Sequence, residues 1–100
     1  MTVIEGNKLK VSREELSLIE KFMGYADGYL SEIITWNDLM PLVEKIHILR
    51  EVREILITPG KTRIWLAKGS YIQSPHKPGN NSITECWLAV VDFIQWYNSQ

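Results

Sequence analysis

The sequence predicts an α+β fold in which a small antiparallel sheet packs with helices, in the order α-α-β-β-(β)-α. Three segments, two in the first half and one at the C-terminus, carry apolar residues at helical spacing behind capping signals. Residues 51–58 and 62–68 are rich in β-branched and aliphatic residues, and Pro59-Gly60 between them predicts the turn of a β-hairpin. Helices segregated from an antiparallel sheet are typical of α+β domains.

The length and composition of the chain indicate one small domain. With 100 residues, of which 45% are hydrophobic, we expect a single domain over residues 1–100 with one modest core. Eleven basic and twelve acidic residues give a net charge of −1. This balance argues against strong electrostatic binding of nucleic acids or anionic membranes. We therefore expect no membrane partner, and nucleic acid is not the first expectation.

The N-terminal third begins with residues 1–10, whose mixed composition predicts a loose arm or a short edge strand. A helix follows, because Ser12 and Glu15 form an S-x-x-E capping box and apolar residues then recur at helical spacing. Gly24 predicts the end of this helix, since glycine readily adopts the left-handed conformation found there. Residues 29–34 of the connector that follows predict a short strand.

The second helix is predicted within residues 35–49, where Thr35 and Asp38 offer a cap. Pro41 conflicts with a start at Thr35, because its ring would clash with the carbonyl of Asn37 and one ladder hydrogen bond would be lost. Either the helix begins near Asn37 or Asp38, which places Pro41 in the first turn, or it kinks at the proline.

Beyond the hairpin, residues 71–73 predict a third, short strand, and residues 74–81 (SPHKPGNN) predict a mobile loop. Strand alternation places Val52 and Leu56 on one face of the sheet, with Ile55 on the other. Apolar residues on both faces predict that both faces are at least partly covered.

The C-terminal helix, from Ser82 onward, is the least charged segment of the chain. Ser82 and Glu85 predict a second capping box. The apolar positions cover about 220° of the helix circumference, against the ~100° typical of packing on one side. We therefore expect this helix to contact a sheet and either a neighbouring helix or another chain. At 100° per residue, the polar stripe left for solvent comprises Thr84, Glu85, Leu88, Asp92 and Gln95.

An ordered triplet of segments carries a resemblance to a known group of proteins: LIEKFMG at residues 18–24, WNDLMPLVEKI at 36–46 and AVVDFIQWYN at 89–98. The triplet resembles small uncharacterised proteins encoded by phages and prophages of gut bacteria, which are similar to the phage ABA sandwich domain. The resemblance implies an origin and an architecture. It implies no activity and assigns no catalytic or binding residue.

The motif Gly60-Lys61-Thr62 ends like a phosphate-binding loop. That loop needs a glycine five residues earlier, where this chain has Ile55, and a helix afterwards, where a strand is predicted here. A hairpin turn accounts for these residues, and we expect no nucleotide cofactor.

The thiol of Cys86 could in principle act as a nucleophile with His47 or His76 as its base. Cys86 lies on the apolar arc of the last helix, however, and this position predicts a buried, unreactive thiol. Scattered histidines and one cysteine do not have metal-ligand spacing. We expect no enzyme activity, no cofactor and no metal. A lone cysteine, no signal peptide and no long apolar run predict a cytoplasmic protein, in the host cytoplasm if phage-encoded.

Two surfaces are candidates for function. The first is a contact with an unknown protein partner or a second copy through Trp96 and Ala89 at the edge of the last helix, together with Trp65 on the sheet. Tryptophan is enriched at interface hot spots, although a position in the core or at its rim is the commoner role.

The alternative is a nucleic-acid-binding module on the hairpin, which combines cations with an aromatic ring, as single-strand binders do. Its residues are Lys61, Arg63, Trp65 and Lys68. Lysines on edge strands also commonly protect against aggregation, which is the structural explanation of the same pattern.

Overall fold

Nine secondary-structure elements form two sheets and three helices within the part of the chain that the computed structural model describes, residues 2–5, 8–59, 61–74 and 81–100. The strands form two antiparallel sheets, ordered β1-β2-β3 and β4-β5-β6. In chain order the elements are β1 (Thr2–Glu5), β2 (Lys8–Lys10), α1 (Arg13–Met23), β3 (Ile33–Thr35), α2 (Trp36–His47), β4 (Val52–Thr58), β5 (Lys61–Leu66), β6 (Tyr71–Gln73) and α3 (Ser82–Asn98).

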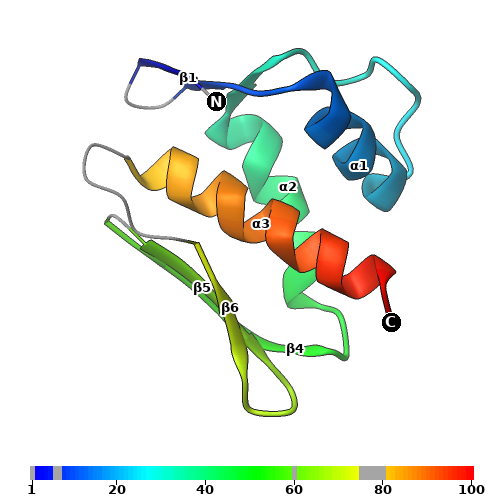
Figure 1. Cartoon of the computed structure of the whole chain (residues 1–100), viewed down its shortest axis with the longest axis vertical. Coiled ribbons are helices and arrows are strands. Elements are labelled where there is room, and N and C mark those ends of the chain that lie inside the picture. The colour runs from blue at the N-terminus through cyan, green and yellow to red at the C-terminus, as the bar shows by residue number, and fades with distance from the viewer. Residues whose placement is uncertain (1, 6–7, 60, 75–80) are drawn as a thin grey trace.

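Helix α3 is the central element, with the β4-β5-β6 sheet on one side and α1 and α2 on the other (Figure 1). It contacts all three strands of that sheet, both other helices and strand β2. The predicted α+β fold is therefore confirmed, as is the expectation that the apolar girth of the last helix is covered on two sides. One cluster of buried side chains runs through all these layers.

The N-terminal sheet was not predicted as a sheet. Residues 2–5 and 8–10 pair antiparallel as β1 and β2, and β2 also pairs with β3. In that second pairing Leu9 lies opposite Ile34, and both side chains are buried. Of the two alternatives predicted for residues 1–10, the short edge strand is confirmed by β1 and the loose arm is wrong. The strand expected at residues 29–34 is shorter and later, at Ile33–Thr35. The pairing joins segments about 25 residues apart, which local patterns cannot reveal.

The first helix follows its sequence signals at both ends. The capping box between Ser12 and Glu15 is present, and Gly24 ends α1 in the left-handed conformation with φ of 78°. The backbone N–H of Gly24 bonds back to the carbonyls of the last turn.

Helix α2 begins at Trp36, with Thr35 as its N-cap, so the later start near Asn37 is wrong. The carboxylate of Asp38 accepts hydrogen bonds from the backbone N–H of Thr35 at 2.9 Å and from its hydroxyl at 3.1 Å. Pro41 lies inside the helix. Both Asn37 and Pro41 are exposed, and water can therefore satisfy the carbonyl that loses its ladder bond.

The β-hairpin and the third strand are confirmed. Thr58 lies opposite Lys61, which leaves a two-residue connection between β4 and β5, and β6 pairs with β5 as expected. Gly60 of the predicted turn and residues 75–80 of the predicted mobile loop lie outside the described residues.

A register shift between Val52 and Glu54 corrects the predicted alternation of β4. Because of this bulge, Val52 lies opposite Leu66 and is buried, whereas Leu56 lies opposite Arg63 and is exposed. The two residues therefore do not share a face. The described helices all lie on one face of this sheet and leave the other face without a covering helix (Figure 1).

The start of α3 differs from the prediction. Asn81, not Ser82, is the N-cap, and its side-chain oxygen accepts from the N–H and the hydroxyl of Thr84 at 3.1 and 2.9 Å. The polar stripe predicted to face solvent is only partly exposed. Thr84 and Glu85 are buried, and only its C-terminal part, Asp92 and Gln95, is exposed. The first turns of α3 are enclosed by surrounding elements, which a helical projection of the sequence alone cannot show.

No helix in the described ranges combines the length and the apolar character that crossing a membrane requires.

Candidate binding surfaces

The β4-β5-β6 sheet presents two chemically different faces because successive side chains of a strand point to opposite sides. Thr62, Ile64 and Leu66 of β5 are buried on the side of α3. The alternate residues of β5 point the other way, together with the residues that lie opposite them on β4 and β6. We call this second side the outer face; its residues are Arg53, Glu54, Leu56, Thr58, Lys61, Arg63, Trp65, Tyr71 and Gln73.

Arginine and aromatic side chains are interleaved on the outer face. The rings of Trp65 and Tyr71 meet edge to face with centroids 4.8 Å apart. The guanidinium carbon of Arg63 lies 4.4 Å from the Tyr71 centroid and 5.4 Å from that of Trp65. The guanidinium carbon of Arg53 lies 5.3 Å from the Trp65 ring centroid. These distances lie within the ~6 Å reach of cation–π attraction.

Arg63 is held in place by a neighbour on the next strand. Its Nε and Nη2 atoms donate to the Oε1 atom of Gln73 at 2.9 and 2.7 Å. Because Gln73 lies opposite Arg63 in the sheet, the backbone register sets this contact. The guanidinium is therefore oriented before any ligand binds.

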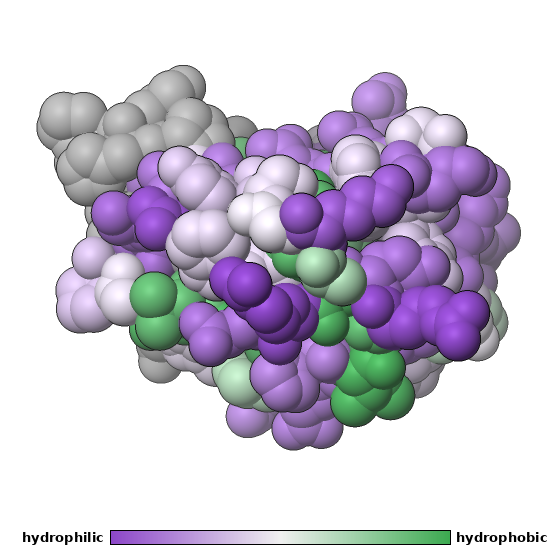
Figure 2. Space-filling view, turned by 90° about the horizontal axis from the view of Figure 1, so that it is seen from below, coloured by the Kyte–Doolittle hydropathy of each residue, from purple (hydrophilic) through white to green (hydrophobic). Residues whose placement is uncertain are grey.

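Figure 2 views the molecule from below, the side on which the β4-β5-β6 sheet lies in Figure 1. Hydrophilic residues predominate in this view, and strongly hydrophobic ones appear as separate small patches. Leu56 and Tyr71 are nearly half exposed on the outer face. The outer face carries three cations, Arg53, Lys61 and Arg63, and one acid, Glu54. It is therefore positive although the chain has a net charge of −1. It is not an apolar docking patch.

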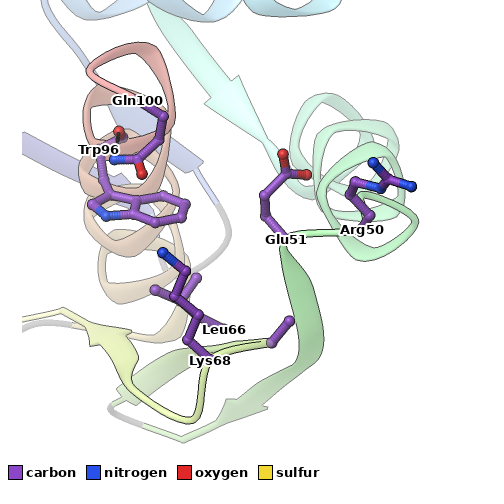
Figure 3. Close-up of a pocket in the computed structure, with 7 residues that line it drawn as sticks. Arg50, Glu51, Leu66, Lys68, Trp96 and Gln100 are labelled. Carbon is purple, nitrogen blue, oxygen red and sulfur yellow. Dashed lines mark hydrogen bonds between the residues drawn. The ribbon is translucent and has the colours of Figure 1, made fainter.

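A groove opens between the end of α3 and the loops that flank the second sheet (Figure 3). Half-buried Trp96 forms part of its wall and packs on Phe93, with ring centroids 5.7 Å apart. In Figure 3 the ammonium group of Lys68 points toward the indole, whereas the guanidinium of Arg50 points away. We call this the Trp96 groove; it encloses about 270 Å³ and is lined by Arg50, Glu51, Leu66, Ala67, Lys68, Trp96 and Gln100.

The residues predicted for a protein interface do not form one surface. Trp96 lines the groove, Trp65 lies on the outer face, and Ala89 is completely buried. The prediction that Ala89 is an interface residue is therefore wrong, because α3 is covered on two sides and its apolar edge is inside the molecule.

The residues predicted for nucleic-acid contact are mostly brought together. Lys61, Arg63 and Trp65 alternate along β5 and share the outer face, but Lys68 lies in the turn after β5 and lines the Trp96 groove instead. Sequence reasoning missed Arg53, because the bulge in β4 places its guanidinium over Trp65 against the simple alternation. It also missed the Gln73 contact, which the β5–β6 register would have indicated.

The thiol of Cys86 is completely buried, as predicted. Burial raises its pKa from 9.0 to about 11, and the neighbouring Thr62 hydroxyl opposes that rise only in part. At neutral pH the thiol is therefore protonated and a poor nucleophile. His47 is exposed at the end of α2, and His76 lies outside the described residues. Among the residues whose structure is described, no group of three or more histidine, cysteine or acidic side chains is arranged to hold a metal ion.

The carboxylate of Glu20 is a buried charge with a structural role. It accepts hydrogen bonds from the backbone N–H groups of Leu30 at 3.0 Å and Gly28 at 3.3 Å, and it pairs with Arg13. The Leu30 hydrogen bond, more than the others, holds the pKa of Glu20 below its usual value against the opposing effect of burial. These contacts attach the connector between α1 and β3 to the first helix.

Comparison of the chain with models of protein families, with curated proteins and with solved structures finds no match. The phage-protein resemblance of the three helical segments therefore stays a prediction.

Proposed function

We propose that this chain is a non-enzymatic binding protein that acts through contact with another protein chain, and that the Trp96 groove is the contact site. The observation that carries the proposal is the half-buried indole of Trp96 in the wall of a concave groove next to buried Leu66. Tryptophan in such a position is the residue type most enriched among interface hot spots.

The size and charge of the groove support a protein side chain as its occupant. Its volume of about 270 Å³ is slightly below the ~300–1,000 Å³ typical of small-molecule sites, so it suits an anchoring side chain. Lys68 directs its ammonium group toward the indole. An apolar anchor followed by an acidic residue would match both features.

The helical triplet supports a phage or prophage accessory protein as the biological setting, on the strength of its resemblance alone. The single cysteine supports a reducing compartment, and we infer that the protein works in the cytoplasm, that of the host if it is phage-encoded.

Sedimentation velocity over a wide concentration range tests a second copy as the partner. We expect the mean mass to rise with concentration for the native chain and for Trp65→Ala, but not for Trp96→Ala. Trp65→Ala is the matched control, because it removes a half-buried indole from the other surface. Circular dichroism of each variant would show that the fold is intact.

If the native chain is monomeric throughout, the partner is a different protein. A photo-crosslinking side chain at position 68 should then yield an adduct in host cells, and Trp96→Ala in the same chain should abolish it. A folded Trp96→Ala variant that behaves like the native chain in both experiments would refute the proposed site.

A further inference from the structure

We propose that the outer face of the β4-β5-β6 sheet binds single-stranded nucleic acid, at a site separate from the Trp96 groove. The core of the site is Trp65 with the guanidinium groups of Arg53 and Arg63 at 5.3 and 5.4 Å from its ring centre. Tyr71 extends the aromatic surface, with its ring centroid 4.8 Å from that of Trp65. Proteins that bind single strands combine aromatic surfaces, on which bases stack, with cations that follow the backbone.

The exposure of these groups leaves room for a base. Tyr71 is 48% exposed, and Trp65 is half buried. Arg63 lies over the Tyr71 ring at 4.4 Å and offers its own planar surface. Guanidinium planes and aromatic rings both stack on unpaired bases, without preference for one base. A short stretch of unpaired bases could therefore contact Tyr71 and the two arginines.

Preorganisation favours binding at this face. Gln73 Oε1 accepts from Nε and Nη2 of Arg63, so the guanidinium is already ordered. A guanidinium has five N–H donors, more than one amide oxygen accepts, and donors therefore remain for a phosphate. Ordering before binding reduces the entropy lost on association.

Charge decides between nucleic acid and an apolar protein surface. The outer face has three cations, Arg53, Lys61 and Arg63, and one acid, Glu54, which leaves an excess of positive charge. The view from this side in Figure 2 is mostly hydrophilic. An anionic polymer with planar bases complements both the charge and the rings. A double helix fits less well, since its bases are stacked on one another and cannot use the aromatic surface.

The expected affinity is modest and depends on salt. Up to three neutralised phosphates give a slope of log K against log salt of about −2, from roughly −0.7 per phosphate for single strands. Binding should therefore weaken about 20-fold between roughly 50 and 200 mM salt.

Fluorescence anisotropy of a labelled twelve-nucleotide mixed-sequence strand, as DNA and as RNA, tests the proposal at about 50 mM salt. Tyr71→Ala should weaken binding at least about fivefold, the lower end of the stacking contribution of one base. Arg63→Ala should weaken binding and make the salt slope shallower by about 0.7. Arg50→Ala is the matched control, because it removes an exposed arginine from outside this face, and Trp96→Ala should bind like the native chain.

Three results would overturn the inference. The first is no binding of either strand by the native chain. The second is a loss in Arg50→Ala as large as in Arg63→Ala, which would indicate unspecific attraction. The third is polyglutamate displacing the strand as effectively as unlabelled strand does, which would assign the face to acidic proteins. Tyr71 is exposed and Arg63 is only partly buried, so both alanine variants should fold.

Discussion

The two faces of the β4-β5-β6 sheet use the same strands for opposite purposes. On β5, Thr62, Ile64 and Leu66 are buried toward α3, whereas the residues between them form a charged and aromatic surface. Side chains on the inner face are excluded from water and contribute to stability through burial. Side chains on the outer face keep much of their hydration, and their positions are set by contacts with each other. The difference predicts that the two faces respond separately to substitution.

The largest effect is expected on the inner face. Ile64→Ala should lower the free energy of unfolding by about 2–5 kcal/mol, because a completely buried side chain leaves a cavity. Leu56→Ala on the outer face should cost less than about 1 kcal/mol, since that side chain is 46% exposed. Denaturant unfolding of both variants measures the contrast. Equal losses would mean that the outer face is covered in solution.

A second prediction uses the thiol that α3 places against the inner face. The folded pKa of Cys86 is about 11, against 9.0 for an exposed thiol, so the unfolded chain loses this proton first as pH rises. Stability from this group is therefore complete below about pH 9 and is lost toward pH 11, by up to about 2–3 kcal/mol at 1.36 kcal/mol per pKa unit.

Denaturant unfolding of the native chain and of Cys86→Ala between pH 8 and about 11 isolates this contribution. The native chain should lose stability more steeply than the variant, because the other alkaline groups are common to both. Parallel curves of stability against pH for the two proteins would contradict the burial of Cys86 on the inner face. Rapid reaction of the native thiol with a thiol reagent at neutral pH would contradict it as well.

The smallest effect is expected from Gln73→Ala on the outer face. The variant keeps every cation but releases Arg63, so stability should change by less than about 1 kcal/mol. Strand binding should weaken about two- to tenfold with an unchanged salt slope, because only the ordering of one side chain is lost. Gln95→Ala, which removes an exposed amide from α3, outside that face, is the control. Unchanged affinity would remove preorganisation from the binding argument.

The sequence correctly predicts those features that depend on interactions between near neighbours in the chain. The capping box of Ser12 and Glu15, the end of α1 at Gly24 and the hairpin across Pro59-Gly60 each depend on residues a few positions apart. The α+β class and the two-sided packing of α3 followed from apolar spacing. Three of the four residues predicted for nucleic-acid contact do share a face, because strand alternation is also local.

Predictions failed where distant segments decide the outcome. The cap at Ser82 is the exception, because it failed for a local reason: Asn81, one residue earlier, offers the same kind of oxygen. Glu85 and Ala89 were expected in contact with solvent or a partner, and both are buried by elements remote in the chain. The bulge at Val52 exchanged the faces of β4 residues, which no local rule indicates.

The sequence by itself determined the three helices and the three strands of the β4-β5-β6 sheet, where most of these elements begin and end, and that α3 must be covered on two sides. These properties depend on spacing and on hydrogen bonds between near neighbours. Tertiary structure alone decided the pairing of β2 with β3, the grouping of Arg53 and Arg63 around Trp65, and the separation of Lys68 from them. Register between strands and packing between layers decide these, because both depend on contacts between residues far apart in the chain.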